Sequence, residues 1–107
     1  MKVRLLRPAL EDLAVAREFY DHQAAGIGGY FFDSMFAEID SLALHAGIHR
    51  VLFGFHRLLA LRCPYAVYYR VIADEVVVFR VLDCRRDPQW IRSALKEGGP
   101  SIKPGQS

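Results

Sequence analysis

The period of the hydrophobic pattern changes at Gly47, and this change limits what the chain can fold into. Before Gly47, apolar residues recur every three or four positions, as along one face of an amphipathic helix. After it, apolar residues form shorter runs that alternate with polar residues or continue unbroken, as in β-strands. Because 107 residues suffice for one core, the pattern predicts a single α+β domain with its helices first and its sheet second.

Two helices are expected in the first half, after a short strand over residues 3–6. The first helix spans roughly residues 8–22 and begins at Pro8, whose missing N–H falls among groups left unpaired at a helix start. The second spans about 29–46, where apolar residues keep helical spacing. We interpret the three glycines between them as a tight inter-helix turn, because a phosphate-binding loop would follow a strand.

Three strands and a short helix are expected in the second half. Residues 76–81 are mostly apolar on both faces, which indicates a central strand buried on both sides. The expected strands are 57–62, 65–72 and 75–82, residues 48–56 are irregular, 89–96 form a closing helix, and 98–107 form a flexible tail. The sequence thus predicts one domain over residues 1–97, in which an N-terminal strand and a helical hairpin pack on an antiparallel sheet of three to four strands. The opposite face of that sheet is expected to be free to bind.

Several classes of protein are excluded. No apolar run approaches the roughly 20 residues that cross a bilayer, and the N-terminus lacks a signal core, so we expect no membrane association and a cytoplasmic location. Cys63 and Cys84 are interpreted as reduced thiols. His45 and His49 have a spacing seen in helical zinc sites, but Gly47 ends the helix between them. We therefore expect no metal and no cofactor.

Charge is unevenly distributed along the chain. Residues 1–48 hold four basic and seven acidic residues, whereas residues 49–96 hold nine basic and four acidic ones. A positive excess on one half of a small domain is typical of a surface that binds an anionic partner, either nucleic acid or an acidic protein.

The second half also holds the candidates for chemistry on RNA. Metal-independent cleavage needs a base, an acid and positive charge at the phosphate, and arginine supplies only the charge because its pKa lies above 12. His56, beside Arg57, is the best candidate for proton transfer. Arg85 and Arg86, after the last strand, either bind phosphate, or instead pair with Asp83 and Asp87 or lie solvated, and the sequence leaves these interpretations open.

The tyrosines of residues 65–72 fall on both faces of the expected strand. Alternation puts Tyr68 and Arg70 on one face, and Tyr65 and Tyr69 on the other. Tyrosines can stack on bases, although at least one of these is expected in the core. The candidate target-binding residues are Arg62, Tyr65, Tyr69, Arg70, Arg80, Arg85 and Arg86.

An ordered set of motifs carries a family resemblance over about residues 3–95. The set includes Asp12-Leu13, Phe19-Tyr20 with the following glycines, the P-Y-x-V-Y-Y run from Pro64, and a valine-rich strand followed by R-R-D-P. In these segments the chain resembles the RelE/ParE superfamily of bacterial type II toxins. The resemblance implies a toxin that a cognate antitoxin protein neutralises. Toxin and antitoxin can then assemble into a hetero-oligomer.

Two branches of that family imply different activities. RelE-like members cleave mRNA on the ribosome with a basic and aromatic cluster, and ParE-like members are associated with inhibition of DNA gyrase. Arg57 and Arg86 match two positions of the RelE cluster, and His56 joins them as a catalytic candidate only in that branch. Three other positions of the cluster are lost, at Leu59, Ala66 and Arg92. The resemblance therefore favours a ParE-like toxin without catalysis, with an endoribonuclease or a non-toxic module that binds only the antitoxin as alternatives.

Overall fold

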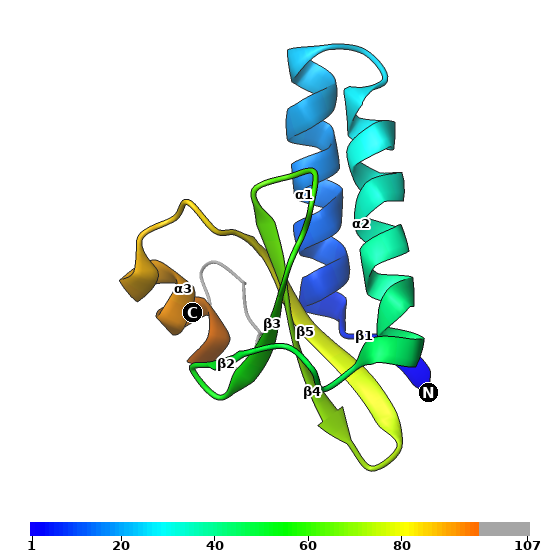
Figure 1. Ribbon diagram of the computed structural model, residues 1–107. Helices are drawn as coiled ribbons and strands as arrows, with labels where there is room; N and C mark the ends of the chain where they lie inside the picture. Colours follow the sequence, from blue (N-terminus) through cyan, green and yellow to red (C-terminus); the bar gives the residue numbers. More distant parts are fainter. Residues whose placement is uncertain (97–107) are drawn as a thin grey trace.

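A computed structural model describes residues 1–96 as two helices and a third, shorter one around a single sheet (Figure 1). The expected tail, 98–107, lies outside the described residues. The elements are β1 (Lys2–Leu5), α1 (Arg7–Gln23), α2 (Ile27–His45), β2 (Val51–Leu52), β3 (Phe55–Leu59), β4 (Tyr65–Ile72), β5 (Glu75–Asp83) and α3 (Pro88–Lys96). The predicted α+β class is confirmed. Within residues 1–96, no helix has the length and apolarity needed to cross a bilayer.

The sheet has five strands in the order β1-β5-β4-β3-β2. Strands β3, β4 and β5 form the predicted antiparallel meander, and β2 adds a strand antiparallel to β3 that was not predicted. Strand β1 pairs parallel with the first half of β5, from Lys2 opposite Glu75 to Leu5 opposite Val78. The sheet is therefore mixed, and larger than the three to four strands expected. Strand β5 lies between β1 and β4, so the prediction of an interior strand, made from residues that are mostly apolar on both faces, is confirmed.

Helices cover both faces of the sheet. The face covered by the α1–α2 hairpin, called here the helix face, carries the main core, including Leu13, Phe31, Val67 and Tyr69. The opposite face, called the α3 face, packs Ala66, Tyr68 and Leu82 against the apolar side of α3. The expectation that this second face is open was wrong in part. Helix α3 is amphipathic, and its apolar residues Ile91 and Leu95 are buried against this face.

Residues 48–56 are not irregular throughout, because β2 and β3 form a hairpin within and beyond them. Its two-residue turn is Phe53-Gly54, with φ angles of 56° and 85°. Two successive positive φ values match the twist of hairpin strands, but asparagine or aspartate usually occupies the first position. Phenylalanine there hid the turn from the sequence pattern.

The glycine-rich segment is the tight turn that was predicted. Gly26 has a φ of 88°, a backbone region that favours glycine, and Gly28 begins the close approach of α2 to α1. The backbone N–H of Gly28 donates to Asp21 Oδ1 at 2.8 Å. The hairpin is thus fixed at the end of α1 by a side chain as well as by packing.

Candidate functional site

His56 and Arg57, the expected catalytic neighbours, lie on opposite faces of β3. His56 stacks on Tyr69 on the helix face, with 5.1 Å between ring centroids, and its Nδ1 donates to the carbonyl of His49 at 2.7 Å. Arg57 pairs across the sheet with Tyr68, which belongs to the α3 face. Successive residues of a strand point to opposite sides, so the imidazole is not beside the guanidinium.

The pair of Arg57 and Tyr68 lies beneath α3. Tyr68 is fully buried, and neither its hydroxyl nor Arg57 Nε has a hydrogen-bond partner in residues 1–96. Burial raises the pKa of Tyr68, and the nearby Arg57 offsets part of that shift. A tyrosine that keeps its proton in this way is a poor general base at neutral pH.

The other two tyrosines of β4 are also poor bases. Burial, assisted by the charge of Asp83, raises the pKa of Tyr65 to about 12. Burial also raises the pKa of Tyr69, which lies in the core with none of its surface exposed. Tyr69, predicted as a target-binding residue, therefore presents no surface to a partner in this structure, because the helix hairpin covers it. Its hydroxyl instead accepts the Gly47 N–H at 2.9 Å and bonds to Nδ1 of His49 at 2.5 Å.

Arg80, also predicted as a target-binding residue, is likewise buried. Its side chain is 9% exposed and forms an ion pair with Asp12 of α1 at 2.7 Å. Burial raises the pKa of Asp12 on balance, although the bonds from Arg80 and from the Val81 N–H oppose the shift. A cationic side chain at this point of β5 thus joins the sheet to α1.

Besides Arg17, which lies over Phe32 of α2 at 4.8 Å, three exposed arginines in the second half of the chain lie against aromatic rings instead of carboxylates. Arg70 lies over Phe55 at 4.0 Å and Phe79 at 5.2 Å, Arg86 over Trp90 at 3.6 Å, and Arg92 over Phe53 at 5.9 Å. Within the described chain none of the three is in an ion pair. A guanidinium stacked on a ring keeps most of its N–H edge available to an anion.

Arg85 and Arg62 have other partners. Arg85 donates to Asp83 through Nε and Nη2, at 3.0 and 2.8 Å, so for this residue the carboxylate pairing left open by the sequence is the one present. Arg62 reaches the hydroxyl of Tyr30 on α2 at 3.4 Å. Arg62 and Arg85 lie at one end of the meander, where Cys84 N–H bonds to Pro64, while Arg70 lies toward the other end of β4. The predicted set is therefore not gathered into one site.

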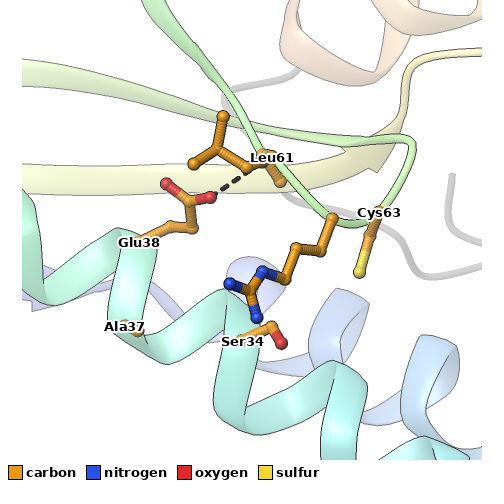
Figure 2. Close-up of a pocket in the computed structure, with 7 residues that line it drawn as sticks. Ser34, Ala37, Glu38, Leu61 and Cys63 are labelled. Atoms are coloured by element: carbon orange, nitrogen blue, oxygen red, sulfur yellow. Dashed lines mark hydrogen bonds between the residues drawn. The ribbon is translucent and has the colours of Figure 1, made fainter.

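A crevice of about 330 Å³ separates α2 from the loop between β3 and β4 (Figure 2). Figure 2 shows Glu38 reaching across it, where the carboxylate accepts the Leu61 N–H at 2.8 Å. Ser34 and Cys63 also line the crevice, but burial raises the pKa of the Cys63 thiol and keeps it protonated. The crevice thus offers no activated nucleophile.

Comparison with known families assigns the chain. Residues 3–88 match the sequence model of the ParE toxin of the type II toxin-antitoxin system, parDE. The chain belongs to the ParE toxin family. Comparison with curated protein sequences finds no relative. Among solved structures, this ParE-family chain is similar to a chain of the "Chromosomal ParDE TA system from P. aeruginosa", with a TM-score of 0.71 and 21% identity over 76% of this chain and 92% of that one.

Membership confirms the predicted resemblance and its ParE-like branch, and the structural match supports the same fold. The chain is thus a ParE-like toxin of a type II toxin–antitoxin system, a class that implies a cognate antitoxin.

The sequence did not predict the aromatic residues that contact Arg70 and Arg86, which are Phe55, Phe79 and Trp90. The sequence offered no clear signal for these contacts, because the separation along the chain between each arginine and its aromatic partner differs from pair to pair.

Proposed function

We propose that this ParE-family toxin inhibits DNA gyrase by binding, without chemistry of its own, and that its antitoxin blocks that binding in the cytoplasm. One observation carries the proposal: His56 and Arg57 are on opposite faces of β3. RNA cleavage needs a proton carrier next to the cationic groups. Here the arginines of the α3 face have tyrosines of raised pKa and aromatic rings as neighbours instead.

The free arginines support a binding role. Arg70 and Arg86 are exposed, stacked on rings and free of carboxylate partners in the part of the chain that the structure describes. Such groups suit the recognition of carboxylates on a protein as well as phosphates. We retain Arg62, Tyr65 and Arg85 as further contacts, and a single domain over residues 1–97.

Purified protein tests the proposal in two parallel assays. We expect it to inhibit supercoiling of relaxed plasmid by gyrase and to leave ribosome-bound mRNA intact. Cleaved mRNA with unaffected gyrase would contradict the proposal and favour the endoribonuclease. Activity in neither assay, from folded protein, would favour a module that binds only its antitoxin.

A pair of variants tests the contact residues. Arg86→Ala is expected to weaken gyrase inhibition about tenfold while the protein stays folded, because Arg86 is exposed and its guanidinium contacts the Trp90 ring but has no hydrogen bond or ion pair in residues 1–96. Arg50→Ala removes an exposed arginine that precedes β2 and serves as the control for lost charge. Equal inhibition by the two variants would remove Arg86 from the interface.

A further inference from the structure

The second half of β5 has an open edge. Strand β1 covers β5 only as far as Val78, whose carbonyl accepts the Leu6 N–H at 3.0 Å, and the chain then turns into α1. Beyond that point the edge lies in a groove of about 240 Å³ between α1 and the start of α3. Its walls include Val15 of α1, which is 68% exposed, and Trp90 of α3, which is 38% exposed.

Two backbone groups on this edge have no partner within the residues that the structure describes, 1–96. The Val81 N–H donates to the Asp12 carboxylate on α1 at 2.9 Å, which shows that it points away from β4. Since the direction repeats every second residue, the Val81 carbonyl and both backbone groups of Asp83 point the same way. The Asp83 carbonyl accepts the Arg86 N–H at 3.2 Å. The Val81 carbonyl and the Asp83 N–H therefore remain unpaired among residues 1–96.

The spacing of these two groups fits one residue of a parallel strand. In a parallel ladder, a residue donates its N–H to one neighbour and accepts from the neighbour two positions further on. An antiparallel partner would need both backbone groups of Val81, and Asp12 already occupies one. We propose that this groove binds an extended segment of a partner protein that continues the line of β1, parallel to β5, with an acidic residue between two apolar ones.

The side chains of the groove give the order of residues in that segment. The residue that bridges Val81 and Asp83 lies opposite Leu82 and shares its face, toward α3. Arg86 stands on that side over the ring of Trp90, with no carboxylate within ion-pair distance in the described chain. The bridging residue is therefore acidic. Its two neighbours point to the opposite face, where exposed Val15 offers an apolar contact.

Trp90 is the single tryptophan of the sequence, so its fluorescence reports on the groove directly. The probe is a blocked peptide of about six residues, a common strand length, with one Val-Glu-Val triplet among serines. We expect saturable changes in Trp90 emission and slower hydrogen exchange of the Asp83 amide. Methylation of the glutamate nitrogen should weaken binding about tenfold, whereas methylation of the following valine nitrogen, which points away from β5, should not.

Variants of the folded protein complete the test. Val15→Asp should abolish peptide binding, while Leu44→Asp, at a site on α2 that is 84% exposed, should not change it. Arg86→Glu should lose the glutamate peptide and bind one with lysine at that place. Absence of both signals, or equal binding of the two methylated peptides, would overturn the inference. It is separable from the gyrase proposal, because peptide binding without gyrase inhibition supports the groove and contradicts only the target.

Discussion

The guanidinium of Arg80 donates to both carboxylate oxygens of Asp12, at 2.7 Å from Nε and 2.8 Å from Nη2. The same carboxylate accepts the Val81 N–H, and Arg80 also reaches the Ala94 carbonyl of α3 at 3.4 Å. One pair of side chains, 68 residues apart in the chain, thus joins α1, β5 and α3.

Loss of Asp12 is expected to destabilise the protein severely. Asp12→Asn leaves the buried guanidinium without its counter-charge and should lower the free energy of unfolding by about 3 kcal/mol. Chemical denaturation measures it, with exposed Glu11→Gln as a control expected to stay within about 0.5 kcal/mol of the parent.

A double variant separates stability from recognition at the same position. Asp12→Leu with Arg80→Met replaces the pair by apolar side chains and should recover most of the lost stability. If gyrase inhibition occurs as proposed, this variant should retain it, because Arg80 is not on the surface. A stable but inactive double variant would return Arg80 to the binding surface.

Two neighbouring glycines are expected to respond oppositely to alanine. A Cβ on Gly28 would lie 2.4 Å from the Arg17 carbonyl oxygen, so Gly28→Ala should cost about 2 kcal/mol. A Cβ on Gly29 would meet no atom of the described residues within 4 Å, so Gly29→Ala should stabilise α2 by about 0.5 kcal/mol. Thermal unfolding of the two variants checks the sign of each change, and equal effects would contradict this packing of the hairpin.

The Tyr69 hydroxyl is expected to contribute more to the free energy of unfolding than the Tyr65 hydroxyl. Tyr69→Phe removes the acceptor of the Gly47 N–H and the partner of His49, which should cost about 1–2 kcal/mol. The Tyr65 hydroxyl has no hydrogen bond to residues 1–96, so Tyr65→Phe should change the free energy of unfolding by less than about 0.5 kcal/mol. The difference between the two variants, measured by urea unfolding, isolates the Tyr69 bonds.

Stability should fall in mild acid because of His49. Burial, and next the nearby charge of His56, lower the pKa of His49 from its ordinary 6.5, so the folded state disfavours the proton that the unfolded chain accepts. The stabilisation is complete above about pH 7.5 and declines as the pH drops through 6.5 toward the lower folded value. His49→Gln keeps an acceptor for Tyr69 but cannot titrate. Its free energy of unfolding should therefore decline less than that of the parent between about pH 7.5 and 5.5.

Local pattern was enough to predict much of this fold. Helical spacing predicted the α1–α2 hairpin, mostly apolar residues on both faces predicted that β5 is interior, and alternation assigned Tyr68 and Tyr69 to opposite faces. These features depend on neighbours within a few residues, which the sequence displays directly. The ordered motifs, from Asp12 to R-R-D-P, were enough to predict the family.

The use of each charged residue depended on contacts that the sequence does not display. Arg80 is buried instead of exposed because its guanidinium pairs with Asp12, which lies on α1, 68 residues away in the chain. A register shift at Tyr68/Tyr69 and the early end of β1 left Val81 and Asp83 on an open edge. Pairing between distant segments sets these outcomes, because hydrogen-bond partners and burial exist only once the strands and helices are assembled.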